Sequence, residues 1–361
     1  MTAAYENESD EVKANLPRLE NMMKGVRTER KKLNLHPSAP KSVGELVITD
    51  AFKLDTPGNR FLLSDVLSKH GKRVIVFCTD SCLYLLKTEC AKSEVFLDAT
   101  FDVAAQHFKQ VLVVRVLLGN TVLPVAYCLL QDKHTYSYTS ALSEIKNAAP
   151  VWDPPTFIAD FEQAEHKAIG ALFPGVHIHG CHFHHCQCLE RNFKKKVTEN
   201  LSENPSLRGE LFTLYAIPFL PPGDIEPAWI VVRDHLLTKY TSTAKFVEYY
   251  DTTWMDGNYP VEMWNCYSRT LESLPRTNNA AEGGNNAMKV SFGCSKPTFW
   301  SFVEKLRRLQ SQADLIIVQH SVGTSNAPRR KRKQVRRQAV ILGKVKDYNK
   351  DMRSEYFATL K

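Results

Sequence analysis

The stretch "FLDATFDV" at residues 96–103 has the apolar and β-branched composition of a buried strand, yet it carries two carboxylates, Asp98 and Asp102. An acid on a strand is most often the solvent-facing half of the alternating pattern. The composition of this stretch alone therefore does not separate a surface role from a functional one, and the neighbouring segments decide between them.

Three strands are predicted in quick succession around this stretch, at residues 94–101, 109–118 and 121–130. The last two, "KQVLVVRVLL" and "TVLPVAYCLL", are separated by Gly119-Asn120, a two-residue hairpin signal. This spacing predicts a three-stranded antiparallel meander.

Helices and strands are predicted to alternate after the meander. The pattern indicates a helix at 135–150, a strand at 156–162, a helix at 163–175 and a strand at 176–180. The order β-β-β-α-β-α-β predicts an α/β fold with a mixed sheet and helices on both faces, because crossovers return right-handed over the sheet. It is the element order of the ribonuclease H-like fold. A strand and a short helix are also predicted upstream, within 73–88.

In such a sheet the first and fourth of these strands lie side by side, so Asp98 and Asp160 are expected to approach each other across 62 residues of chain. Two carboxylates in a half-buried place repel each other unless a cation holds them, and a divalent metal ion is the common solution. Asp102 and Glu162 are expected on the same face, as further ligands or simply as charge.

An all-helical insertion is predicted from about 200 to 270, where apolar residues recur at i, i+3 and i+4. The amide-rich and glycine-rich stretch "PRTNNAAEGGNNAMK" at 275–289 follows and carries one acid, Glu282. Such an acid is ordinarily a helix-start or loop residue. A long helix is predicted at 298–319.

Composition limits the cellular setting. The polar N-terminus and the lack of a stretch of about 18 uncharged apolar residues predict neither secretion nor a membrane span. Nine cysteines, an odd number without a dense framework, indicate reduced thiols in the cytosol or nucleus. The excess positive charge behind the net charge of +8 lies largely in two basic blocks, one near each end of the chain. The block near the C-terminus predicts a nuclear-import signal or a phosphate-contacting arm. Its residues are Arg329, Arg330, Lys331, Arg332, Lys333, Arg336 and Arg337.

Four motifs occur in register: "FLDATF", "GNTVLPVAYCLLQDKHTYSYTSAL", "FIADFEQAEHKAIGALFPGVHIHGCHFHHCQ" and "RTNNAAEGGNN". In order and spacing they resemble the Mutator-like (MULE) transposase domain of the DDE/D superfamily, from about residue 93 to 320. The stretch 46–92 resembles the lead found in animal members. The resemblance implies a ribonuclease H-like catalytic core interrupted by a helical insertion.

The resemblance also implies a catalytic triad of Asp98, Asp160 and Glu282, which would hold two Mg²⁺ or Mn²⁺ ions for cleavage and transfer of DNA strands. Its partners would be double-stranded DNA, as transposon ends and target, and further copies of the chain on that DNA; the expected location is the nucleus. The alternative is a domesticated descendant that binds DNA or chromatin without chemistry.

The Cys-x-x-His element of the family is matched by Cys181 and His184 in the cluster "CHFHHCQC". Tetrahedral zinc needs four ligands, and no second well-spaced pair accompanies them, so zinc is not expected, through Cys186 and Cys188 in particular. Capping and packing of a helix that begins near Phe183 is the other interpretation. Two family features are missing: a Cys/His zinc module before Asp98, and a histidine soon after Glu282.

The expected organisation has six parts. A charged lead and linker is followed by a small α/β segment, the first part of the core, the helical insertion, the rest of the core with the third acid, and a basic tail. Their bounds are 1–45, 46–92, 93–199, 200–274, 275–320 and 321–361.

Overall fold

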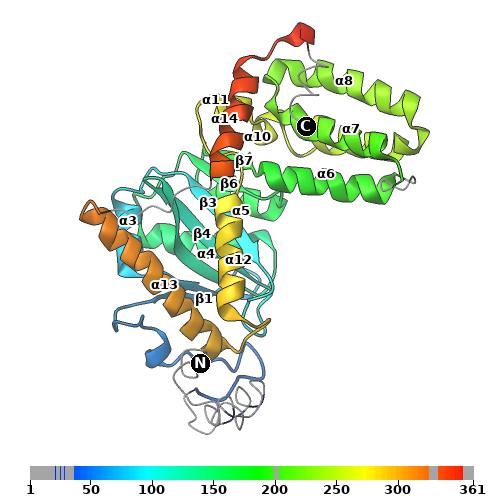
Figure 1. Cartoon of the computed structure of the whole chain (residues 1–361). Helices are drawn as coiled ribbons and strands as arrows, with labels where there is room; N and C mark the ends of the chain where they lie inside the picture. Colours follow the sequence, from blue (N-terminus) through cyan, green and yellow to red (C-terminus); the bar gives the residue numbers. More distant parts are fainter. Residues whose placement is uncertain are drawn as a thin grey trace, which may run out of the picture.

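The computed structural model describes residues 21, 25, 28, 36–197, 199, 203–324 and 332–352. Its centre is one seven-stranded mixed sheet with the strand order β1-β2-β5-β4-β3-β6-β7 (Figure 1). The strands are β1 (Leu62–Leu67), β2 (Arg73–Phe77), β3 (Val95–Thr100), β4 (Gln110–Leu118), β5 (Thr121–Leu130), β6 (Thr156–Ala159) and β7 (His177–Gly180).

The predicted meander is present, since β3 pairs antiparallel with β4 and β4 with β5. The β4–β5 turn falls at Gly119, whose φ of +55° is a conformation that glycine adopts without steric cost. On the other side, β3 pairs parallel with β6, and β6 parallel with β7. The mixed sheet predicted from the element order is thus confirmed, and it is compatible with a ribonuclease H-like fold.

The segment 46–92 adds two strands to this sheet, because β2 pairs antiparallel with β5 and β1 with β2. The short helix predicted after the first strand of 73–88 is α3 (Asp80–Lys87), which begins at the N-cap Thr79, whose hydroxyl accepts a hydrogen bond from the Cys82 N–H. The flanking segment therefore shares the hydrophobic core of the sheet.

Helices cover the two faces of the sheet, and alternate residues of strand β2 pack into two different cores. Val74 and Val76 pack with α3, α4 (Thr135–Ala148) and α5 (Gln163–Leu172). Ile75 and Phe77 pack on the opposite face with α12 (Asn279–Phe292) and α13 (Phe299–Ser321). Among the described residues, no helix is long and apolar enough to cross a membrane.

The predicted helical insertion extends away from the sheet (Figure 1) and has an aromatic core of its own, including Phe193, Trp229, Phe246, Tyr250, Trp254 and Trp264. The insertion was predicted from about residue 200, but Leu189 and Phe193 of α6 already belong to its core, so the helical part begins with α6 and ends before α12. Its elements are α6 (His182–Lys196), α7 (Pro205–Ala216), η3 (Ile217–Phe219), α8 (Pro222–Lys239), η4 (Thr241–Thr243), α9 (Ala244–Tyr250), η5 (Asp251–Met255), α10 (Val261–Trp264) and α11 (Tyr267–Leu271).

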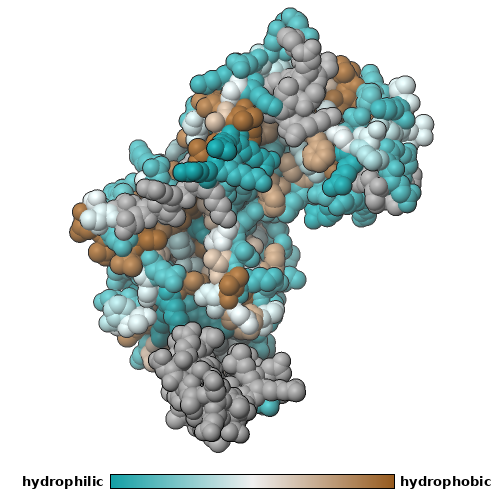
Figure 2. Space-filling model, in the orientation of Figure 1, coloured by the Kyte–Doolittle hydropathy of each residue, from teal (hydrophilic) through white to brown (hydrophobic). Residues whose placement is uncertain are grey.

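The last described α-helix, α14 (Arg332–Lys346), packs against α11 and buries Val345 beside Phe219 and Cys266. Figure 2 shows hydrophilic residues over much of the helical part, and hydrophobic ones near the end of α13. Leu315, Val318 and Val322 are more than half exposed there. Two further short helices are η2 (Asp50–Phe52) and η6 (Lys350–Met352).

Candidate active site

The parallel pairing of β3 and β6 brings the first two acids to one level. Phe96 lies opposite Ile158, so Asp98, two residues further along β3, is level with Asp160, which directly follows β6. Asp98 is only 9% exposed, and it faces away from the core that contains its neighbour Leu97. The approach of the two aspartates that the sequence predicts is therefore a consequence of strand register.

The third acid comes from α12, and the amide-rich stretch around it is a helix. Glu282 lies in the first turn, where an acid is favourable because the helix N-terminus is positive. The next residue back, Ala281, packs on Phe96 and Ile158 and so fixes the start of α12 over β3 and β6. Glu282 thus reaches the same edge of the sheet as the two aspartates.

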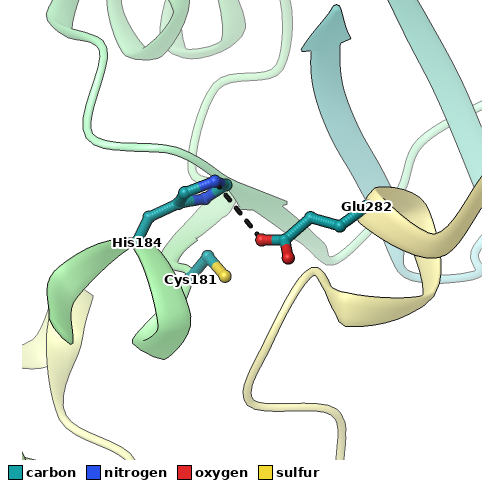
Figure 3. A group of neighbouring side chains, drawn as sticks. All are labelled: Cys181, His184 and Glu282. Carbon is teal, nitrogen blue, oxygen red and sulfur yellow. Dashed lines mark ion pairs between the residues drawn. The ribbon is translucent and has the colours of Figure 1, made fainter. Parts of the chain in front are cut away.

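His184 lies beside two of these acids, Asp160 and Glu282, and Figure 3 shows its contact with Glu282. Its Nε2 is 3.3 Å from Oε1 of Glu282, and its Nδ1 is 3.7 Å from Oδ1 of Asp160. Both distances allow charge attraction, but neither contact is a hydrogen bond: within the described part of the chain, Nδ1 of His184 and Oε1 of Glu282 are buried without a hydrogen-bond partner. Two polar atoms at the centre of the site are therefore available to a ligand.

Cys181 is the N-cap of α6 and is fully buried. Its Sγ accepts a hydrogen bond of 3.0 Å from the backbone N–H of Asn278, which ties the start of α6 to the start of α12. Burial raises the pKa of the Cys181 thiol to about 12. The helix that the sequence places near Phe183 begins at His182, and Cys181 occupies its N-cap position without a side-chain capping hydrogen bond.

Asp98 is positioned by Asn285 directly and by Arg115 through Asn285, and neither residue was predicted from the sequence to belong to the site. Asn285 of α12 donates a 2.7 Å hydrogen bond to Oδ2 of Asp98, and Arg115 of β4 donates a 2.6 Å hydrogen bond to Oδ1 of Asn285. The Arg115 bond fixes which end of the amide faces the aspartate. Two signals were visible: a lone arginine inside a buried strand, and an asparagine one helical turn after Glu282.

Burial changes the acidity of this cluster. Desolvation raises the pKa of Asp98 to about 6, although Arg115 and His184 act in the opposite direction. Desolvation also raises the pKa of Glu282, while His184 lowers it. Behind them, buried Glu165 has a pKa well above its ordinary value, first because of desolvation and then because of Asp160. The site therefore accumulates acids that are costly to ionise together without added positive charge.

The donor set fits hard divalent cations. Asp98, Asp160 and Glu282 offer carboxylate oxygens, the ligands that Mg²⁺ and Mn²⁺ prefer, and Oε1 of Glu282 is buried without a hydrogen bond. A bound cation would satisfy that oxygen and favour the ionised form of Glu282, whose pKa is raised first by desolvation and then by repulsion from Asp98 and Asp160.

The two additional acids have other partners. Asp102 does face α12, as expected from alternation with Asp98, but it is exposed and pairs with Lys289 near the end of that helix. Glu162 is the N-cap of α5 and pairs with Lys133 at 2.9 Å. Each carboxylate is thus balanced by a lysine, and the geometry does not support a role as a metal ligand.

The basic block lies partly on α14. Arg332, Lys333, Arg336 and Arg337 are exposed on this helix, whereas Arg329, Arg330 and Lys331 fall outside the described residues. The helix reaches the start of α12 through a hydrogen bond from Arg276 to Gln338. Arg337 is also close enough to His182 of α6 to lower the pKa of that imidazole, after the larger effect of burial.

Comparison with known proteins gives one family match. Residues 94–188 match the family model of the MULE transposase domain. No curated protein matches the chain. Among solved structures, the Drosophila P element transposase strand transfer complex matches at 10% sequence identity and a TM-score of 0.29, over 65% of this chain and 81% of that one. The family match includes Asp98, Asp160, Cys181 and His184, and ends before Glu282.

Proposed function

Since residues 94–188 carry a MULE transposase domain, we propose that this chain is a DNA transposase that cleaves DNA strands and joins them to a target with the help of two divalent metal ions. The observation that carries the proposal is the convergence of Asp98, Asp160 and Glu282 from β3, β6 and α12 at one edge of the sheet. Three acids that converge from distant parts of the sequence repel one another, which is unfavourable for folding. Such clusters of acids are typical of functional sites.

Asp98, Asp160 and Glu282 are the proposed ligands of Mg²⁺ or Mn²⁺. When bound, such ions stabilise the negative charge on the attacking and leaving oxygens of an in-line phosphoryl displacement. The protein residues fix the positions of the ligands: Asn285 holds one oxygen of Asp98, and the backbone N–H of Phe161 donates a 2.6 Å hydrogen bond to Oδ1 of Asp160. Preorganisation of this kind avoids rearrangement of the carboxylates during the reaction.

Double-stranded DNA is the proposed substrate, as transposon end and as target. The exposed cations of α14 lie on a helix whose Gln338 accepts a hydrogen bond from Arg276, just before α12, and whose Arg337 lowers the pKa of His182 in α6. Lys and Arg in such a place would contact phosphates on the approach to the acids. Two ends are joined in one reaction, so we also propose that at least two copies act together on DNA, in the nucleus.

The test is a nicking assay on double-stranded DNA with Mn²⁺. Wild-type protein should nick the DNA, whereas Asp160→Asn and Glu282→Gln should lose nicking and keep DNA binding. Asp153→Asn is the matched control, because Asp153 is an exposed acid outside the site and its variant should nick like wild type.

Equal nicking by Asp160→Asn and wild type would contradict the proposal. DNA binding by the wild type without any nicking would instead identify a domesticated DNA-binding descendant.

A further inference from the structure

We propose that Cys181, His184 and Glu282 form a second metal site, selective for a soft divalent ion such as Zn²⁺, and that an ion bound there withdraws Glu282 from the magnesium site. The binding site is argued from the geometry alone. Its inhibitory effect rests on the proposed function.

The ligand atoms are already close. Sγ of Cys181, a ring nitrogen of His184 and a carboxylate oxygen of Glu282 all lie within 4.8 Å of one another, and Figure 3 shows the three side chains converging from the start of α6 and the start of α12. Nε2 of His184 and Oε1 of Glu282 are 3.3 Å apart. Two ligands of one tetrahedral zinc ion are separated by about 3.4 Å, given bonds of about 2.1 Å. The separation of that pair therefore matches two ligands of one zinc ion.

The second nitrogen of His184 has the partner that a metal-bound histidine requires. A ligating imidazole directs its other N–H to a carboxylate or carbonyl, which fixes the tautomer and the ring orientation. Nδ1 of His184 is 3.7 Å from Oδ1 of Asp160 and is buried without a hydrogen bond among the described residues. A small closing movement completes a carboxylate–histidine–metal arrangement with Asp160 outside the coordination shell.

The chemistry of the ligands separates this site from the catalytic one. A thiolate and an imidazole select zinc and reject magnesium, which takes oxygen ligands. The fourth position of a zinc tetrahedron would be filled by water. Binding displaces the thiol proton of Cys181 to solvent, so the ion takes the place of that proton. Because Glu282 belongs to both ligand sets, occupation of one site empties the other.

Spacing in the sequence cannot reveal this site. Cys181 and His184 stand three residues apart, but the third ligand follows after the whole helical insertion. The expectation that zinc is absent rests on the lack of a second nearby pair. The structure supplies the third ligand from a different helix.

The test uses Co²⁺ as a spectroscopic substitute for Zn²⁺ on full-length, EDTA-stripped protein. Wild type should develop thiolate-to-cobalt charge-transfer absorption and tetrahedral d–d bands, and Zn²⁺ should displace the cobalt. Cys181→Ser and His184→Asn should lose these bands. Asp160→Asn should keep them with affinity reduced by about 10- to 100-fold, the effect of removing an outer partner.

The controls address the other cysteines. Cys294 is exposed, and Cys186 lies 3.6 Å from Nε2 of His182, where a different ion could bind. Cys294→Ser and Cys186→Ser should therefore keep the full cobalt spectrum. Loss of the bands in Cys186→Ser with retention in Cys181→Ser, or absence of tetrahedral bands from the wild type, would overturn the proposed site.

The functional arm adds Zn²⁺ to the Mn²⁺ nicking assay. Zinc should inhibit nicking by the wild type in proportion to the fraction of the Cys181, His184 and Glu282 site that it occupies. Nicking without cobalt binding, or nicking that persists when zinc saturates the site, would refute the inference and leave the transposase proposal standing. Cobalt binding in a wild type that never nicks would retain the metal site and reject the transposase function.

Discussion

Asp98 and Asn285 are joined by a 2.7 Å hydrogen bond although 187 residues separate them in the chain. One belongs to the first strand of the meander and the other to a helix that follows the whole insertion. The bond occupies one oxygen of Asp98, the most buried of the three proposed catalytic acids. It therefore connects assembly of the fold with orientation of the proposed catalytic carboxylate.

Replacement of Asn285 by Ala should destabilise the protein by about 3 kcal/mol, because buried Arg115 is then left without its hydrogen-bond acceptor. Arg115→Met in the same background should recover part of this stability, because no buried cation then remains unpaired. Urea unfolding of both single variants and the double variant measures the coupling, expected at about 1 kcal/mol or more. Strict additivity would show that the two residues act independently.

Gly283 and Gly284 of α12 form a matched pair. A methyl group at Gly283 meets nothing within 4 Å, so Gly283→Ala should stabilise the helix by about 0.5–1 kcal/mol. At Gly284 the new carbon would lie 3.0 Å from a guanidinium nitrogen of Arg115, which Asn285 holds in place. Gly284→Ala should therefore destabilise by about 1–3 kcal/mol. Equal gains at the two positions, measured by urea unfolding, would contradict the tight approach.

Asp98→Asn should stabilise the metal-free protein at neutral pH. Folding raises the pKa of Asp98 to about 6, so the stability that its protonated form provides is complete below about pH 4 and is lost as the pH rises through about 6. The amide does not titrate and keeps its contribution. Relative to wild type, the variant should gain up to about 3 kcal/mol between pH 4 and pH 7.

Chemical unfolding in EDTA at several pH values measures this difference, with Asp153→Asn as the exposed control. Added Mn²⁺ should reverse the order, because it stabilises a wild type that binds it and not the variant. A gain that does not change with pH would show that desolvation is not its cause.

Removal of two cations of α14 should weaken DNA binding in a salt-dependent way. For Arg336→Ala/Arg337→Ala, the slope of log affinity against log salt should become shallower by about 0.9 for each DNA phosphate that the variant no longer neutralises. Lys87→Ala/Lys92→Ala is the charge-matched control, taken from α3 and the loop after it. The same change of slope in both double variants would indicate an effect of net charge and not of this helix.

The meander and the alternating elements could be predicted from the sequence because their signals are local. Apolar runs ended by Gly119-Asn120 fix the β4–β5 hairpin, and the strand order follows from rules of connection. The joining of β1 and β2 to the same sheet could not be predicted, because pairing of β2 with β5 is long-range and has no local signature.

The approach of Asp98 and Asp160 could also be predicted from the sequence, because the pairing of β3 with β6 places them side by side. The helical state of the stretch around Glu282 was harder to predict. Glycine and asparagine are poor helix formers, and α12 is stabilised by packing of Met288 and Phe292 on the sheet. The supports of the site, Arg115 and Asn285, depend on that packing and remain hidden until the helix is placed.

The position of α12 after the insertion affects how the protein is made. Asp160 leaves the ribosome 122 residues before Glu282, a delay of roughly 6–24 seconds at a synthesis rate of about 5–20 residues per second. During this interval the nascent sheet has Phe96 and Ile158 uncovered, because Ala281 of α12 packs on them. The same late step covers this apolar surface and adds the third acid, so an unfinished chain exposes Phe96 and Ile158 and has only two of the three proposed catalytic acids.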